Sequence, residues 1–283
     1  MTMAAAERTG VGTFAHRKAQ GVPIVMATAY DVSTARMVDA AGLDAILVGD
    51  SLGMVILGDE DTLSVTVADM IHHTRAVKRA ASRTLVIADL PSRSYLSASR
   101  AVQNARRLVT RGGAEAVKLE GGTGVAPIVR AIVDAGIPVQ GHIGLTPQQV
   151  RALGGWRVQG RTAEGARQIA DDALALEDAG CFSVVIECVP AAVAAYVTGS
   201  LRIPTIGIGA GSGTSGQVLV LHDLLGITPG ARPRFVKAFA DVAGVADEAL
   251  VRYREEVRLR TFPAIEHTYE MPAPEWQRFI DGV

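Results

Sequence analysis

Short apolar runs alternate with longer amphipathic segments along most of this chain. Eight runs rich in Val, Ile, Leu and Ala predict buried strands over 23–29, 45–49, 84–88, 116–119, 137–141, 183–186, 204–208 and 217–221. Between most of them, apolar residues recur every three or four positions, as they do over 125–133 and 101–109. The segment 66–69 resembles a capping box that would open a helix. This alternation predicts parallel strands joined by helical crossovers.

The number of runs and their uniformly apolar character favour a closed α/β barrel of the (β/α)8 TIM type as a single domain. An open, doubly wound sheet remains the alternative. No linker-like or low-complexity segment interrupts residues 20–260. We therefore predict an N-terminal segment or helix over 1–20, a catalytic barrel over 21–260 and a C-terminal tail over 261–283.

Composition narrows the class of protein. The chain has 283 residues, of which 48% are hydrophobic and 20% charged. Its formal net charge is −1 and it has no long run of Lys or Arg, so neither nucleic acid nor a membrane is an expected partner. No apolar stretch is long enough to cross a bilayer. The two cysteines, Cys181 and Cys188, cannot form a disulfide framework or a zinc cluster, which fits a cytoplasmic protein.

Four of the predicted strands end in, or run directly into, a carboxylate. These are Asp50, Asp89, Glu120 and Glu187. A buried acid at a strand end does not stabilise the strand and carries a desolvation cost. The carboxyl ends of barrel strands lie on one face, where the active sites of such barrels are found. A single strand-end acid often caps the next helix, but four together indicate an active site.

Carboxylate oxygens at such a face suit a hard divalent cation, most often Mg²⁺. Lys118 lies two positions before Glu120, so strand alternation directs both side chains into the barrel, where the lysine would neutralise acids or hold a substrate carboxylate. His142 ends the fifth run and either lines the pocket or is a buried structural histidine. Cys188 has no adjacent basic residue and reads as a wall residue rather than a nucleophile.

Two loops carry further candidates. The glycine-rich segment 207–213 precedes a strand instead of a helix, which excludes a dinucleotide-binding loop. It is either a phosphate nest or a tight turn that lets backbone approach the substrate, and we favour the turn. The loop 154–161 contains Arg157 and Arg161, which would close over substrate or mediate subunit contacts.

Seven ordered motifs resemble the ketopantoate hydroxymethyltransferase family, collinearly from about Thr28 to His267. They are LVGDSLG at 47–53, VIADLP at 86–91, VKLEGG at 117–122, GHIGLTPQ at 141–148, VQGR at 158–161, ECVP at 187–190 and GIGAG at 207–211. The family is similar in fold to the phosphoenolpyruvate mutase and isocitrate lyase barrels. It transfers a hydroxymethyl group from 5,10-methylenetetrahydrofolate to 3-methyl-2-oxobutanoate in pantothenate synthesis.

The resemblance implies roles for the residues that match the motifs. Mg²⁺ would be bound by Asp50 and Asp89, with Glu120 in its coordination shell. Asp50, Ser51, Asp89 and Lys118 would contact the 2-oxo acid, and Glu187 would accept its proton to give an enolate. Family members typically assemble as homodecamers, so a homo-oligomer is expected.

The chain also departs from the family pattern. Ser92 and Arg93 stand where an aromatic residue is usual, the segment 59–61 is unusually acidic, and the chain continues beyond His267. These departures leave open a different 2-oxo acid or one-carbon donor. The alternatives are a Mg²⁺-dependent lyase or mutase of the related barrels, which would need no folate, and a barrel with a purely binding role, which would have no need of the acids.

Overall fold

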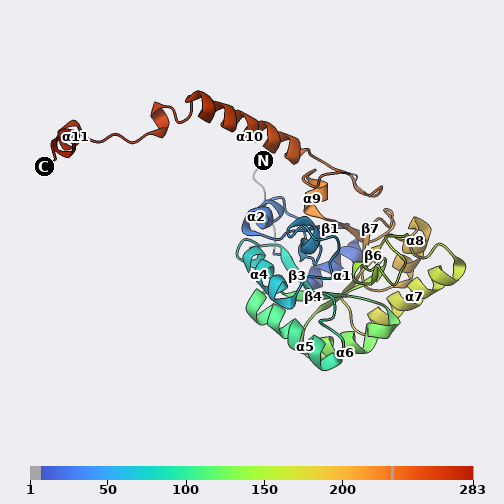
Figure 1. The fold of residues 1–283 in the computed structure, drawn as a ribbon. Helices are drawn as coiled ribbons and strands as arrows, with labels where there is room; N and C mark the ends of the chain where they lie inside the picture. The colour runs from blue at the N-terminus through green and yellow to red at the C-terminus, as the bar shows by residue number, and fades with distance from the viewer. Residues whose placement is uncertain (1–7, 231–232, 283) are drawn as a thin grey trace.

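The chain folds as a closed barrel of eight parallel strands in sequence order (Figure 1). The computed structural model describes residues 8–230 and 233–282; the part of the predicted N-terminal segment over 1–7 lies outside them. The strands are β1 Ile24–Thr28, β2 Ala45–Val48, β3 Leu85–Asp89, β4 Ala116–Glu120, β5 Val139–Gly144, β6 Ser183–Glu187, β7 Thr205–Ile208 and β8 Gly216–Leu219. Because β1 pairs with both β2 and β8, the predicted closed barrel is confirmed and the open sheet is excluded.

Helices follow most strands, and most of them cover the outside of the barrel. The helices are α1 Val11–Gln20, α2 Val32–Ala40, α3 Leu52–Val55, α4 Val67–Lys78, α5 Ala98–Arg107, α6 Ala126–Asp134, α7 Ala163–Asp178, α8 Ala191–Ser200, α9 Leu221–Leu224, α10 Val242–Leu259 and α11 Ala273–Ile280. Single turns occur at Leu108–Gly112, Thr123–Val125, Pro147–Gln149 and Ile265–His267. The predicted capping box opens α4, where Thr66 and Asp69 each accept a hydrogen bond from the other's backbone N–H.

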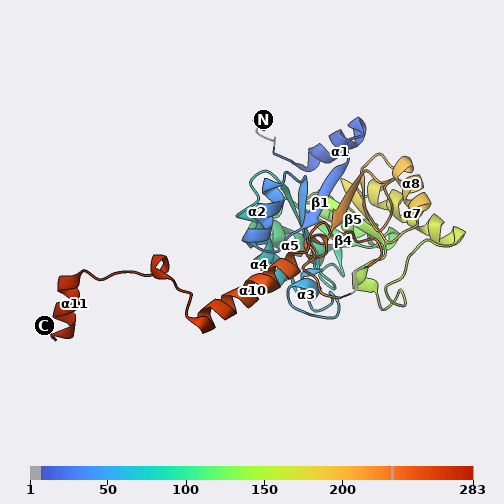
Figure 2. The same ribbon diagram turned by 90° about the horizontal axis from the view of Figure 1, so that it is seen from above.

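The amino-terminal end of the barrel is closed by α1. Phe14 on this helix is fully buried, and its ring packs edge-on against Phe182 with centroids 5.3 Å apart. The Lys18 ammonium donates to three carbonyl oxygens at and after the end of α8. Figure 2 shows α1 and α3 at opposite ends of the barrel. The carboxyl end, where α3 lies, is therefore the end that remains open for a site.

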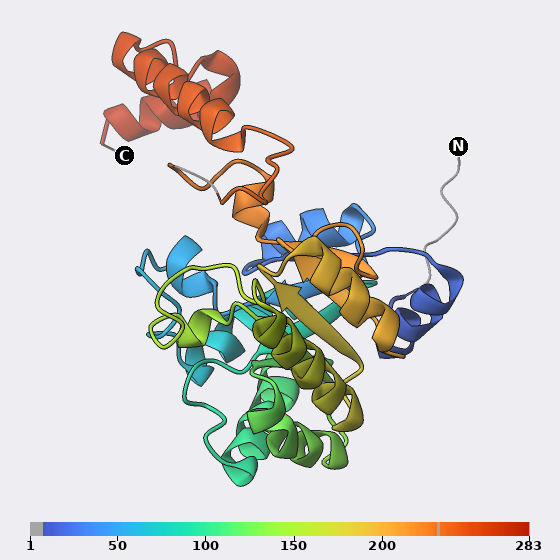
Figure 3. The ribbon, with the colours of Figure 1, turned by 90° about the vertical axis from the view of Figure 1, so that its right-hand side faces the viewer.

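The C-terminal arm, which we define as residues 239–282, leaves the barrel. No residue of α10 or α11 is buried, and the red and orange segments extend away from the strands (Figures 1 and 3). Helix α10 falls within the range 21–260 predicted for the barrel, whereas α11 falls in the predicted tail. Within the described residues, no helix combines the length and the apolar character that crossing a membrane requires.

Candidate active site

A cavity of about 450 Å³ opens at the carboxyl ends of the strands. Every residue that the sequence singled out as catalytic, metal-binding or substrate-binding lines it: Asp50, Ser51, Asp89, Lys118, Glu120, His142 and Glu187. The open end of a parallel barrel is the position in which such enzymes place their active sites. The convergence expected from the strand ends is therefore present in the folded chain.

Strand register explains why these side chains meet. Neighbouring parallel strands place Asp89 beside Lys118, and Glu120 beside His142. Lys118 and Glu120 are separated by two positions and point to the same side of β4, into the cavity. Glu187 ends β6 across from Gly144 of β5. The positions of these residues in their strands therefore determine how far along the barrel each polar group lies and that it points into the cavity.

Lys118 and Asp89 form a buried ion pair, with 2.7 Å between Nζ and Oδ1 and both side chains at most 4% exposed. Burial disfavours the Lys118 ammonium, but Asp89, Glu120 and Asp50 outweigh burial and raise its pKa. The other oxygen of Asp89 accepts a hydrogen bond of 3.1 Å from the backbone N–H of Asp50. Lys118 is therefore a fixed positive charge among the acids.

The site holds more negative than positive charge. Burial, followed by repulsion from Asp89 and Glu120, raises the pKa of Asp50 well above its usual range. Counted as charged groups, the four acids Asp50, Asp89, Glu120 and Glu187 against Lys118 and His142 leave two formal negative charges among these six cavity residues. As the described side chains stand, no three of them are close enough to form a metal cage. Their oxygen-only donor set and their excess charge nevertheless fit a hard divalent cation.

His142 connects two of the acids. Its Nδ1 lies 3.4 Å from Glu120 Oε1, and its Nε2 lies 3.1 Å from Glu187 Oε2. Burial and the nearby Lys118 lower the pKa of His142, but the two carboxylates raise it to about 9. His142 is 3% exposed and lines the cavity, and within the described residues its Nε2, although close to Glu187 Oε2, meets no partner with hydrogen-bond geometry, so it differs from a structural histidine whose two ring nitrogens are both satisfied.

Gln148 and Tyr95 were missed as site residues. The Gln148 side chain donates to Asp50 Oδ2 at 2.7 Å, and its backbone N–H donates to Glu120 Oε2 at 2.9 Å. The Tyr95 hydroxyl donates to Gln148 Oε1 at 2.5 Å. The available signal was position, since Gln148 is polar and closes the GHIGLTPQ motif after β5.

The loop candidates separate into two groups. Arg157 and Cys188 line the cavity. Burial, together with the negative charge of Glu187, raises the pKa of the Cys188 thiol to about 12. A thiol that stays protonated is a poor nucleophile, which fits a residue of the cavity wall. Arg161, Ser92, Arg93 and the acidic segment 59–61 are not among the described residues that line it. Trp156 and Phe235 do line it and were not predicted.

The glycine-rich loop packs against two different neighbours. A Cβ at Gly211 would lie 2.5 Å from that of Ala191, and a Cβ at Gly213 would lie 2.8 Å from that of Ala195, so these two glycines permit close packing against α8. A Cβ at Gly209 would lie 2.9 Å from the ring of Phe235 and 3.4 Å from the Cys188 sulfur, and both of these residues line the cavity. The approach of this loop to substrate stays a prediction.

Comparison with known proteins identifies the relatives of the chain. The family model described as ketopantoate hydroxymethyltransferase matches residues 8–265. The chain is 58% identical to 3-methyl-2-oxobutanoate hydroxymethyltransferase of Nitratidesulfovibrio vulgaris (strain DP4) over 266 residues, 93% of this chain and 87% of that protein. It is 52% identical to the protein of the same name from Clostridium novyi (strain NT) over 262 residues, 92% of this chain and 95% of that protein. The resemblance inferred from the motifs is confirmed.

Solved structures share the fold at low sequence identity. Phosphonopyruvate hydrolase in complex with oxalate and Mg²⁺ has a TM-score of 0.59 at 13% identity, covering 97% of this chain and 98% of that one. The trigonal form of 2,3-dimethylmalate lyase, a member of the PEP mutase/isocitrate lyase superfamily, has a TM-score of 0.59 at 16% identity, covering 98% and 93%. These similarities show that the chain shares its fold with those two enzymes.

Proposed function

Because the chain belongs to the ketopantoate hydroxymethyltransferase family and is a hydroxymethyltransferase, we propose that it transfers the hydroxymethyl group of 5,10-methylenetetrahydrofolate to 3-methyl-2-oxobutanoate. The product would be 2-dehydropantoate, a precursor in pantothenate synthesis. The observation that carries the proposal is the meeting of four strand-end acids and Lys118 in one cavity. An acidic face with one fixed ammonium suits the deprotonation of a 2-oxo acid at the carbon beside its carbonyl.

We propose that Asp50, Asp89 and Glu120 hold Mg²⁺. Their carboxylate oxygens are the donors that this cation prefers, and they carry the excess negative charge that it would balance. When bound, Mg²⁺ would polarise the carbonyl of the 2-oxo acid and so make the adjacent C–H more acidic. Asp50, Ser51, Asp89 and Lys118 would contact the 2-oxo acid, with the Lys118 ammonium stabilising the negative charge of the enolate.

Glu187 is the proposed general base. It lies at the end of β6, and its side chain is 14% exposed, so it faces the cavity while most of its surface is shielded from water. His142 Nε2, 3.1 Å from Glu187 Oε2, would hold that carboxylate in place. Removal of the C3 proton by Glu187 gives the enolate. Its carbon then forms the new C–C bond to the methylene of the folate iminium, in which one C–N bond has already opened, and water replaces the remaining C–N bond to give the hydroxymethyl product and tetrahydrofolate. A positioned base contributes roughly 10²–10⁴-fold to such a step.

The proposal is tested by exchange of the C3 proton of 3-methyl-2-oxobutanoate in D₂O. We expect Mg²⁺-dependent exchange in the native enzyme and a loss of about 10²–10⁴-fold in Glu187→Gln, with the 2-oxo acid still bound. Glu164→Gln on the surface of α7 is the matched control. Exchange in Glu187→Gln at the native rate would remove Glu187 from this role. Product formed only after 5,10-methylenetetrahydrofolate is added would distinguish the transferase from a lyase or mutase.

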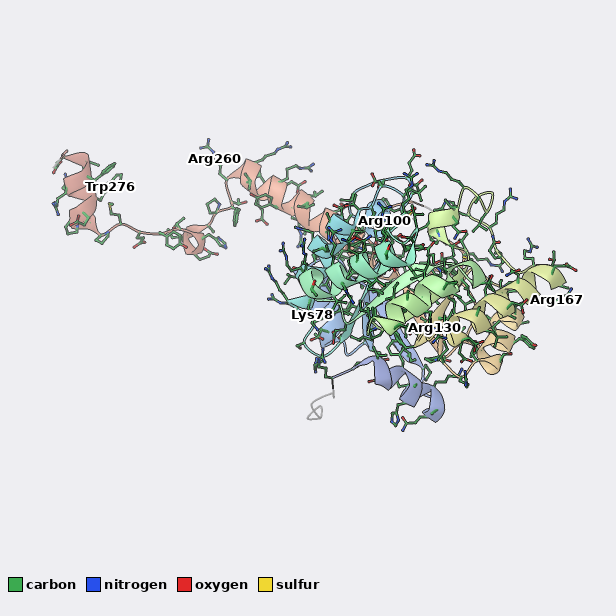
Figure 4. All side chains as sticks on the ribbon, turned by 90° about the horizontal axis from the view of Figure 1, so that it is seen from below. Lys78, Arg100, Arg130, Arg167, Arg260 and Trp276 are labelled. Atoms are coloured by element: carbon green, nitrogen blue, oxygen red, sulfur yellow. The ribbon has the colours of Figure 1, made fainter. Side chains whose placement is uncertain are left out.

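We further propose that the protein is a homo-oligomer, with the decamer of the family as its expected form. The support is the C-terminal arm, which carries exposed apolar side chains and lies away from the barrel (Figure 4, where Arg260 and Trp276 mark the arm). The outer faces of β1 and β8 are correspondingly uncovered at the paired residues Val25 and Gln217, and Val25 is 48% exposed. If α10 of a second copy packed against β1 and β8, the contact would cover both the apolar face of the arm and the exposed outer faces of these strands.

We also propose a cytoplasmic location, supported by the two free cysteines.

A further inference from the structure

Among the hydrogen bonds of the described residues, Gln148 is the one residue outside the proposed ligand set that donates to both Asp50 and Glu120, to Asp50 from its side chain and to Glu120 from its backbone N–H. It follows β5 in the turn Pro147–Gln149. Its Nε2 donates to Asp50 Oδ2 at 2.7 Å and to the Leu90 carbonyl oxygen at 3.0 Å. Its backbone N–H donates to Glu120 Oε2 at 2.9 Å. One residue therefore connects the carboxyl ends of β2, β3 and β4 to that of β5.

The orientation of the Gln148 amide is determined by its neighbours. Both groups facing Nε2 are acceptors, the Asp50 carboxylate and the Leu90 carbonyl, so the NH₂ end must point to them. The opposite end, Oε1, accepts a hydrogen bond of 2.5 Å from the Tyr95 hydroxyl. A flipped amide would place oxygen against oxygen at Asp50 and Leu90, so these two acceptors fix the orientation. The Tyr95 hydroxyl, which can donate or accept, holds the amide in that orientation by donating to Oε1, and it also lies 3.3 Å from the Glu120 carbonyl oxygen.

We propose that Gln148 is a positioning residue that fixes the carboxylates of Asp50 and Glu120 for a divalent cation, and that Tyr95 acts through Gln148. The inference rests on the proposed Mg²⁺-dependent function. Each of the two carboxylates has one oxygen engaged by Gln148, Oδ2 of Asp50 and Oε2 of Glu120. Two buried acids that repel each other would otherwise rotate apart, and a hydrogen bond to each opposes that rotation. Partners of this kind orient metal ligands and set metal affinity.

The inference is tested by calorimetric titration of Mg²⁺ into the full-length, metal-free enzyme without substrate. Gln148→Met keeps the length of the side chain but removes its polar atoms, so it removes the hydrogen bond to Asp50 and leaves the backbone bond to Glu120 in place. We expect it to weaken Mg²⁺ binding about 10- to 100-fold, the usual effect of losing such a partner. The Mg²⁺ concentration that gives half-maximal rate should rise by the same factor, while the maximal rate at saturating Mg²⁺ falls less. The exposed neighbour Gln149, changed to Met, is the matched control and should bind Mg²⁺ as the native enzyme does.

Tyr95→Phe removes only the hydroxyl and provides a second variant should Gln148→Met fail to fold. We expect a smaller loss of Mg²⁺ affinity, and no additional loss when Tyr95→Phe is combined with Gln148→Met, because the two residues act in series. Native Mg²⁺ affinity in Gln148→Met would overturn the inference, and additive losses in the double variant would overturn the role of Tyr95. A native enzyme that binds no Mg²⁺ would instead count against the proposed function.

Discussion

At the scale of single residues, Asp39 in α2 shows how a buried acid is kept ionised. It is 7% exposed and accepts four hydrogen bonds, from the Ser82 hydroxyl, the Thr84 hydroxyl and the backbone N–H groups of Arg83 and Thr84. Burial acts to raise the pKa of Asp39, but these donors together hold it well below its usual range. The carboxylate thereby ties α2 to the turn before β3.

Asp39→Asn should lower the free energy of unfolding by about 1–3 kcal/mol at pH 7, because it removes a charge-assisted acceptor and leaves buried donors poorly satisfied. Because the pKa of Asp39 is lower in the folded protein than in the unfolded chain, its carboxylate stabilises the fold at pH values above the unfolded pKa of about 3.9. This stabilisation is lost as the pH falls through the pKa of the folded protein. The deficit should therefore be the same at pH 7 and pH 5 and should narrow only below about pH 4. Urea denaturation measures it, with the exposed Asp134→Asn as control; equal deficits for the two variants would contradict the prediction.

Asp50 illustrates the opposite case, an acid that its surroundings destabilise. Its pKa is raised, so the ionised form at pH 7 lowers the stability of the folded state in the absence of a cation. Asp50→Asn should therefore stabilise the chelator-treated protein, by about 0.5–2 kcal/mol. It should also abolish most of the stabilisation that the native protein gains on addition of Mg²⁺. Thermal unfolding with EDTA and then with Mg²⁺ measures both effects. A variant less stable than the native protein in EDTA, or stabilised equally by Mg²⁺, would refute this account.

At the scale of elements, the glycine-rich loop between β7 and β8 is held against α8 by contacts that leave no room for a side chain. Gly211 adopts a φ of +77°, and an added Cβ would lie 2.5 Å from the Ala191 Cβ. Two separable costs therefore oppose any larger residue, a left-handed backbone and a steric clash.

Gly211→Ala should destabilise the barrel by about 2–4 kcal/mol, the sum of roughly 1 for the backbone and 1–3 for overpacking. Gly230→Ala is the matched control, since its φ is +84° but an added Cβ would meet no atom of the described residues within 4 Å. Combining Gly211→Ala with Ala191→Gly removes the clashing Cβ and should recover part of the loss. Denaturant midpoints give the comparison; equal effects at 211 and 230 would show that packing against α8 contributes nothing.

The sequence predicted the barrel because its strands are buried on both faces, so each appears as a continuous apolar run such as 45–48 or 183–186. Helix α6 was predictable for a related reason, with Val129 and Ile132 on one buried stripe. The path of α10 was not predictable, because an amphipathic pattern specifies that a face will be covered but not which surface covers it. Similarly, the glycines at 211 and 213 indicated close approach without identifying α8 as the neighbour.

The same distinction applies to the site. Four acids at strand ends could be placed together from the sequence, because barrel closure fixes where strand ends meet. The contact of Tyr95 with Gln148 joins two loop residues 53 positions apart. This contact depends on side-chain rotamers and on the paths of two loops, which the periodicity of the sequence does not specify. For the same reason, Trp156 and Phe235 were recognised as cavity residues only in the folded chain.

At the scale of the whole molecule, the C-terminal arm carries an apolar stripe that its own barrel leaves exposed. Val242, Val245, Ala249, Tyr253 and Val257 form a stripe along α10 at intervals of three or four residues. Val245 is 68% exposed and Tyr253 is 57% exposed. Amphipathic helices of this length owe most of their stability to packing of the apolar face. The arm therefore needs a surface outside its own barrel, and the proposed homo-oligomer supplies one.

Changing Val245 and Tyr253 to aspartate should dissociate the assembly, because it places charges in the proposed interface. Both side chains are more than half exposed in the single chain, where the Tyr253 ring packs against Phe262 of the same arm. The native protein should sediment as an oligomer at micromolar concentration, and Val245→Asp/Tyr253→Asp as a smaller species. The variant should also unfold at a lower temperature that depends on protein concentration, since association stabilises by mass action. Arg252→Asp, which alters a polar position of the same helix, is the control and should sediment as the native protein does. A native protein that sediments as a monomer, or a double variant that keeps the native size, would show that the arm has another partner.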